Sequence, residues 1–204
     1  MITSFAELNE ERISQLLARR VADPYISPLR EMISDVEPKP AAVLIPMLRQ
    51  DGEWHLLFIL RAQVEGDMHS AQVAFPGGRL DPGETTAQEA ALREAREEIA
   101  LDTGNIRLLG NLEDFITISN YQVTPVVGVI PWPIELHPDP REVQRVFTIP
   151  LSWLVDPINR EQRERVAPDG QTLKVVYFKP YDRELLWGVT ARITLNFLHA
   201  LQLA

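Results

Sequence analysis

The chain has 204 residues, of which 45% are hydrophobic and 24% charged, and its 29 acidic and 20 basic residues give a net charge of −9. This length and composition are typical of one large globular domain, or of a domain with appended segments. The acidic balance argues against broad electrostatic binding to nucleic acid or membranes, and the lack of cysteine excludes disulfides, thiol nucleophiles and cysteine-based metal sites.

The amino-terminal segment is predicted to form an amphipathic helix. Apolar residues recur at roughly helical spacing between Ser4 and Arg20, and Ser4 with Glu7 makes a capping-box pattern. Prolines then punctuate a connector, so we expect residues 1–40 to form a helix and connector and residues 41–204 to form the main domain. No stretch is apolar enough to span a membrane. Because no targeting segment is recognisable either, we expect a cytoplasmic protein.

The next segment predicts a β-hairpin followed by a loop and a long helix. Ala41–Leu48 and Trp54–Arg61 have the pattern of strands joined at the turn Asp51-Gly52. A glycine-bearing loop leads to a helix from about Thr85 to Ile99. Four apolar residues form its predicted packed stripe: Ala87, Ala91, Ala95 and Ile99.

The remaining half continues with short strands, a proline-rich loop and a final helix. Pro125 predicts that the strand carrying it lies at a sheet edge or contains a bulge. The pattern as a whole indicates a single α+β domain. The predicted strands are Ile106–Asn111, Phe115–Ile118 and Gln122–Ile130, then a hairpin of Glu164–Val166 with Thr172–Phe178, and the helices lie at Ile149–Leu154 and around Val189–Leu201.

Several common catalytic motifs are absent from the sequence. It contains no Gly-x-Ser-x-Gly, no His-Glu-x-x-His and no Gly-x-Gly-x-x-Gly, which removes the usual signs of serine hydrolases, zincins and Rossmann folds. Gly78 and Gly83 have the spacing of a phosphate-binding loop. Glu84, however, puts a negative charge where that loop needs a lysine.

Three glutamates on the predicted long helix suggest a cation site. Glu94, Glu97 and Glu98 stand at i, i+3 and i+4 and therefore share one face, where like charges repel. A solvated acidic face relieved by Arg93 and Arg96 is the simplest interpretation. A metal site is favoured because the opposite helix face is apolar and glycines precede the helix, and because Mg²⁺ prefers carboxylate oxygens.

The segment Gly77–Leu101 resembles the Nudix box, a loop–helix–loop metal site. The resemblance implies a Nudix fold, an α/β/α sandwich with a mixed sheet, and hydrolysis of a nucleoside diphosphate derivative with Mg²⁺ or Mn²⁺ and an activated water. Two departures are a spacer before Arg93 that is one residue longer than usual, and Ala100 in place of a glycine. The matched residues are Gly78, the loop acid Glu84, the helix-orienting Arg93, and the metal-binding Glu94, Glu97 and Glu98, of which Glu97 or Glu98 is the expected general base.

The flanking sequence resembles the coenzyme A diphosphatases among Nudix hydrolases. Leu60-Arg61 and the run 69–78 carry this likeness, and the stretches 121–128 and 187–191 resemble later landmarks of that subgroup. It implies cleavage of coenzyme A to adenosine 3′,5′-bisphosphate and 4′-phosphopantetheine. The expected substrate-binding residues are Arg61, His69, Gln72, Gly77, Gly78 and Arg79, with Glu142 as a further carboxylate. Ordinary surface pairing and loop hydrogen bonding are the alternatives for these side chains.

Two other functions stay open at this point. One is a Nudix pyrophosphatase for another substrate, such as ADP-ribose or a nucleotide sugar. The other is a non-catalytic binding module, against which the three intact glutamates count. Members of the family commonly form dimers, and the amino-terminal helix and the loop 131–140 are surfaces where subunits can meet.

Overall fold

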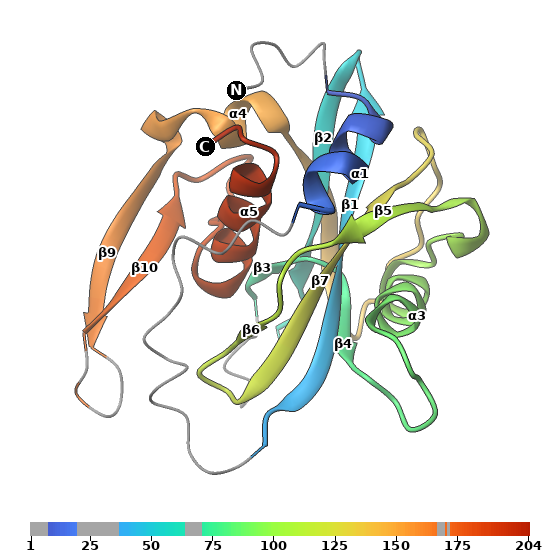
Figure 1. Ribbon diagram of the computed structural model, residues 1–204, viewed down its shortest axis with the longest axis horizontal. Helices are drawn as coiled ribbons and strands as arrows, with labels where there is room; N and C mark the ends of the chain where they lie inside the picture. Colours follow the sequence, from blue (N-terminus) through green and yellow to red (C-terminus); the bar gives the residue numbers. More distant parts are fainter. Residues whose placement is uncertain (1–7, 20–36, 64–70, 167–169, 171) are drawn as a thin grey trace.

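The computed structural model describes residues 8–19, 37–63, 71–166, 170 and 172–204. It forms three layers, in which a central sheet separates one long helix from a group of helices on the other face (Figure 1). The helices are α1 (Glu10–Leu17), α3 (Ala87–Ile99), α4 (Leu151–Val155) and α5 (Gly188–Ala200), with short 3-10 turns at Thr103–Asn105 and Pro157–Asn159. None of the described helices is long and apolar enough to cross a membrane.

The central sheet is mixed, as the resemblance implied. Its main path runs in the order β3-β2-β1-β7-β5, with β4 beside β1, β6 beside β7 and β8 beside β2. Of its pairings, β1 with β7 is parallel and the others are antiparallel. Its strands are β1 (Lys39–Gln50), β2 (Glu53–Arg61), β3 (Val73–Ala74), β4 (Gly77–Arg79), β5 (Arg107–Asn111), β6 (Phe115–Ile116), β7 (Tyr121–Val129) and β8 (Val143–Pro150).

A second sheet of two strands stands apart from the first. Strands β9 (Arg160–Val166) and β10 (Thr172–Phe178) pair in antiparallel register over their whole length. This confirms the predicted second hairpin, although β9 begins four residues earlier than expected. The buried side chains of β10, including Phe178, join the core beside α5.

Two buried clusters fill the space on the two faces of the sheet. The cluster on the α3 face includes Ala90, Ala91, Ala95 and Ile99 of that helix. This confirms the predicted stripe except at Ala87, which is half-buried. The cluster on the other face joins α1, α4 and α5 with the sheet and contains most of the large aromatic side chains, so both faces of the sheet are covered.

The amino-terminal helix is shorter than predicted. It begins at Glu10 because the Asn9 side chain accepts a hydrogen bond from the Arg12 backbone N–H and caps the first turn. The predicted capping residues Ser4 and Glu7 lie outside the described residues. The carbonyl of Leu8 accepts hydrogen bonds from Trp54 and from Arg49, which attach this segment to the β1–β2 hairpin.

Two sequence-based expectations about strands were wrong. Strand β7, which carries Pro125, lies inside the sheet between β1 and β5, and the irregular register lies in β5, between Leu108 and Gly110. Pro125 lies beside the gap between β5 and β6, where its carbonyl accepts a hydrogen bond from the Leu112 backbone N–H. The proline is tolerated because an N–H at this position would point into the same gap, so no ladder hydrogen bond is lost. The second error is strand β8, which pairs with β2 and was not predicted.

Candidate active site

Helix α3 is held firmly at both ends, which fixes the direction of its glutamates. Thr86 and Glu89 form a reciprocal capping box at its start. At its end Ala100 adopts a left-handed conformation, with φ of 53°, and its N–H bonds to the Arg96 carbonyl. The alanine that departs from the Nudix box thus occupies a backbone position that favours glycine.

The three glutamates of α3 lie in different surroundings. The Glu98 side chain is 1% exposed, that of Glu94 is 16% exposed, and that of Glu97 is 57% exposed. Glu98 lies nearest the sheet, where one carboxylate oxygen accepts a hydrogen bond of 3.0 Å from the Gly77 backbone N–H. Its other oxygen lies 3.6 Å from a guanidinium nitrogen of Arg61, at the end of β2.

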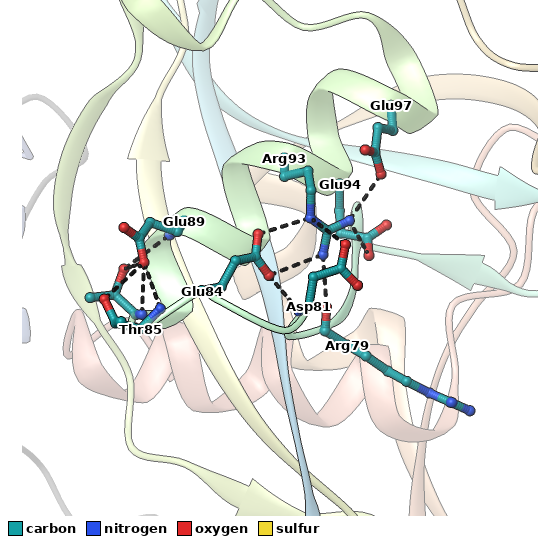
Figure 2. A network of polar contacts seen from close by, with 9 residues as sticks. Arg79, Asp81, Glu84, Thr85, Glu89, Arg93, Glu94 and Glu97 are labelled. Atoms are coloured by element: carbon teal, nitrogen blue, oxygen red, sulfur yellow. Dashed lines mark hydrogen bonds and ion pairs between the residues drawn. The ribbon is translucent and has the colours of Figure 1, made fainter.

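Arg93 connects the glycine-bearing loop to the helix. Its guanidinium donates to Glu84, Glu94 and Glu97 at distances of 2.8–3.2 Å. A further bond of 2.8 Å goes to the backbone carbonyl of Arg79 (Figure 2). Glu84 in turn accepts from the Asp81 backbone N–H, which closes the loop onto the helix. Arg93 therefore bonds to both the loop and the helix, and Glu84 belongs to the same network.

The two glycines before the helix allow β4 to approach its neighbours closely. A Cβ atom at Gly78 would lie 2.2 Å from Oε1 of Glu94, and one at Gly77 would lie 2.4 Å from the Ala42 carbonyl oxygen. Neither position accepts a side chain without displacing its neighbour. The close approach of β4 to α3 thus depends on Gly78, and its close approach to β1 depends on Gly77.

Burial and like charges make ionisation of the inner glutamates unfavourable. Burial raises the pKa of Glu98 to about 8, and the neighbouring charges of Glu94 and Glu142 add to this effect. Burial also raises the pKa of Glu94, to which the charges of Glu97 and Glu142 contribute. Glu142, which sequence analysis offered only as a further carboxylate, thus faces the same site from the segment just before β8.

These carboxylates have the donor chemistry of a divalent-cation site. Mg²⁺ and Mn²⁺ prefer oxygen ligands, and a cation bound among the inner glutamates would offset the burial and the like-charge repulsion that raise their pKa values. In the described part of the chain no three acidic or imidazole groups converge as a ready-made cage. One guanidinium nitrogen of Arg93 contacts both Glu94 and Glu97. Metal binding would therefore exchange part of the arginine network for metal contacts.

The predicted substrate-binding residues are placed unequally. Arg61 lies beside Glu98. The Arg61 backbone N–H donates a hydrogen bond to the Gln72 carbonyl, so Arg61 and Gln72 both lie at the end of the sheet next to α3. The Arg79 side chain points away from the carboxylates (Figure 2) and packs over the Tyr121 ring, 5.2 Å from its centroid. Thus only the Arg79 carbonyl reaches the network. His69 lies outside the described residues.

One residue near the site was missed by sequence analysis. Asp81 lies 3.5 Å from the Arg93 Nε atom, in addition to its backbone bond to Glu84. The turn signal Asp81-Pro82-Gly83 could have located it, because such residues place a carboxylate on a tight loop. Its side chain is mostly exposed, so it supports the loop from the solvent side.

Comparisons with known proteins match most of the chain. A model of the NUDIX domain matches residues 38–170. A Photorhabdus laumondii protein named "Uncharacterized Nudix hydrolase NudL" is 37% identical over 153 residues, which cover 75% of this chain and 80% of that protein. The protein of the same name from Pectobacterium atrosepticum is 35% identical over 163 residues, covering 76% and 79% of the two chains.

A solved structure extends the likeness to the whole fold. The crystal structure of a MutT/nudix family protein from Enterococcus faecalis matches with a TM-score of 0.51 and 15% identity. The match covers 98% of this chain and 74% of that one. At this identity the likeness concerns the fold alone.

Proposed function

This chain belongs to the Nudix domain family, and from that premise we propose that it hydrolyses the pyrophosphate bond of coenzyme A. The products would be adenosine 3′,5′-bisphosphate and 4′-phosphopantetheine. Membership of the family implies a phosphoanhydride hydrolase, and the choice of coenzyme A rests on the flanking sequence. Acyl derivatives of coenzyme A carry the same bond and belong to the same proposal.

The contact between Arg61 and Glu98 is the observation that supports this proposal most directly. Arg61 belongs to the segment that resembles coenzyme A diphosphatases, and Glu98 belongs to the Nudix box; the two charged groups lie 3.6 Å apart. A guanidinium at this position can bind phosphate oxygens in a bidentate manner next to the carboxylates. The flanking signature and the box therefore form one site.

The proposed reaction assigns separate tasks to the residues of the site. Glu94, Glu97 and Glu98 would hold Mg²⁺ or Mn²⁺, which neutralises the diphosphate and lowers the pKa of a bound water. Glu97 or Glu98 accepts the proton of the attacking water, and Arg93 keeps Glu94 and Glu97 oriented. Arg61 and Gln72 bind the substrate, and Gly77 with Gly78 lets it approach the backbone closely. Glu84 and Glu142 complete the polar surroundings.

The decisive experiment compares substrates under identical conditions. The protein is incubated with coenzyme A, ADP-ribose or a dinucleoside polyphosphate, in Mg²⁺, in Mn²⁺ or in EDTA, and the products are separated by chromatography. We expect metal-dependent cleavage that is fastest for coenzyme A. Faster hydrolysis of ADP-ribose would favour a nucleotide-sugar type of Nudix enzyme instead, and no metal-dependent cleavage of any substrate would favour a binding module.

A matched pair of variants shows whether the cleavage comes from this site. Glu98→Gln removes the buried carboxylate, whereas Glu135→Gln makes the same change at a side chain that is 85% exposed and outside the network. Activity should be lost in the first and kept in the second. Activity kept in both variants would point to a contaminating hydrolase, and equal loss in both would point to misfolding.

A further inference from the structure

Strand β9 lies at the outer margin of the molecule, where no other described strand pairs with its outer edge. In the described residues it pairs with β10 alone, and Figure 1 shows β10 between β9 and helix α5. After Arg160, every side chain of β9 is exposed. An unpaired strand edge presents a row of backbone donors and acceptors that a further strand can bind.

The hairpin that carries this edge is attached rigidly to the domain. The Tyr177 ring stacks on Trp187, with ring centroids 5.5 Å apart, and Arg163 of β9 packs over the same ring at 4.5 Å. Arg160 donates to the carbonyl groups of Leu154 and Val155 in α4. The edge therefore has a fixed shape before any partner arrives, which lowers the entropic cost of docking.

We propose that β9 pairs antiparallel with β9 of a second copy of this chain, across a twofold axis at Gln162. The two hairpins would then form one continuous four-stranded sheet. A second copy is the occupant that the charges favour, because the sequence Arg-Glu-Gln-Arg-Glu-Arg-Val complements itself in this register. This inference is independent of the catalytic proposal.

The register centred on Gln162 places unlike charges opposite one another at four positions. Arg160 faces Glu164 of the partner subunit and Glu161 faces Arg163 of the partner subunit, and the symmetry repeats both pairs. Within one chain, Glu161 already accepts a hydrogen bond of 2.7 Å from Arg163. Pairing would extend this contact to a cluster of four charges with alternating sign on the face that carries Tyr177.

An exposed apolar side chain lies at, or just beyond, each end of β9. Ile158 is 66% exposed and Val166 is 73% exposed, more than any other large hydrophobic side chain in the described part of the chain. With Gln162 on the axis, Val166 of one copy extends past the paired residues toward the partner subunit's 3-10 turn, the turn that carries Ile158 in each chain. Both would lose contact with water there.

Neighbouring registers are unfavourable, which makes the pairing specific. A shift of one residue in one direction puts Glu161 opposite Glu164 and Arg160 opposite Arg165. A shift in the other direction puts Arg160 opposite Arg163. Like charges directly across an antiparallel pair are destabilising.

Cross-linking tests the axis directly, because the natural chain has no cysteine. In Gln162→Cys the two new thiols would lie across the axis, with Cα atoms about 4.5–5.5 Å apart, within disulfide range. In the control Glu164→Cys the two thiols would be four residues apart along the strands, about 13 Å. We expect an oxidised Gln162→Cys dimer that reductant reverses, and a Glu164→Cys monomer. Equal cross-linking of the two variants, or none in either, would overturn the proposal.

Charge reversal provides the second test, with the oligomeric state measured by sedimentation velocity over a range of concentrations. Arg163→Glu places like charges opposite one another and should weaken self-association by about tenfold or more. The double variant Glu161→Arg with Arg163→Glu exchanges the charges across the axis and should recover most of that loss. Circular dichroism checks that both variants are folded. A chain that is monomeric at all concentrations, or a dimer that Arg163→Glu leaves unchanged, would contradict this interface.

Discussion

Helix α3 and strand β9 both carry acidic side chains beside arginines, but they place them in different surroundings. The helical period brings Glu94 and Glu98 to one partly buried face, where burial raises the pKa of both. Along β9 the acids alternate with arginines on an exposed strand, and Glu161 is paired with Arg163. A buried cluster of like charges is unfavourable until a cation binds, whereas an alternating row of charges can be satisfied by protein groups alone.

The largest effect should follow from removing a carboxylate of α3. Glu97→Gln and Glu98→Gln should lower kcat for coenzyme A hydrolysis by about 10²–10⁴-fold, the range for loss of a general acid–base group. Steady-state kinetics at saturating Mg²⁺ or Mn²⁺ would measure this. Glu135→Gln, at an exposed acid, should keep the kcat of the natural chain. Unchanged turnover in both α3 variants would disprove the site assignment.

The pH dependence of stability should separate the buried carboxylate from the exposed ones. Because the pKa of Glu98 is raised to about 8, its stabilising contribution is fully present below its ordinary value of 4.5 and is lost as the pH rises through 8. In EDTA, Glu98→Gln should therefore have a higher Tm than the natural chain at pH 9 and no advantage at pH 4. At pH 9 the corresponding difference in the free energy of unfolding should be on the order of a few kcal/mol, since one pKa unit is ~1.4 kcal/mol.

The comparison for this measurement is again Glu135→Gln. Its Tm should follow that of the natural chain at every pH, because the Glu135 carboxylate lies in solvent. If Glu98→Gln and the natural chain had the same Tm at every pH, the pKa of Glu98 would not be raised by burial.

The arginine that links the loop to α3 should have an intermediate effect. Arg93→Ala removes contacts to Glu84, Glu94, Glu97 and the Arg79 carbonyl. We expect a loss of about 1–3 kcal/mol in the free energy of unfolding, measured with urea, together with a lower kcat.

Arg96 is the matched control for that arginine. It lies on the same helix and bonds through its side chain to Thr103, so Arg96→Ala should change the free energy of unfolding by less than about 0.5 kcal/mol. Equal destabilisation by both variants would mean that the loss of an arginine's aliphatic stem from the helix surface, rather than the network, sets the effect of Arg93→Ala.

The smallest predicted effect concerns the end of α3. The turn of the β9–β10 hairpin has a glycine, Gly170, at a positive φ of 85°. The residue that caps the end of α3 also has a positive φ, of 53°, but it is an alanine, Ala100. Ala100→Gly should stabilise the protein by about 1 kcal/mol, because glycine avoids the left-handed penalty. Thermal unfolding would show this, and kcat should not change. A lower Tm would mean that the alanine methyl group contributes packing that outweighs the strain.

Much of the fold could be predicted because local patterns and tertiary structure agree. The β1–β2 hairpin, helix α3 and the β9–β10 hairpin each have a clear period and clear turn residues. Strand β8 was not predicted because the prolines between Pro131 and Pro140 indicate a loop just before it, and because Arg145 interrupts the alternation of apolar residues along the strand. That arginine is accommodated by ion pairs with Asp182 and Glu184, far away in the sequence.

The composition of the site was predictable, but its electrostatics were not. Spacing alone places three glutamates on one face. Which of them is buried depends on β2 and β4, because Arg61 and the Gly77 backbone N–H enclose Glu98 whereas Glu97 remains in solvent. The direction of the Arg79 side chain likewise depends on Tyr121 of β7, a neighbour that the spacing does not reveal.

The contact between Gly78 and Glu94 has a consequence for how such a sequence can diverge. Since a Cβ at position 78 would lie 2.2 Å from the Glu94 carboxylate, the two positions cannot vary independently. A side chain at position 78 would force the Glu94 carboxylate to swing away from its present position. The direction of this acid is therefore set by a neighbour that has no side chain at all.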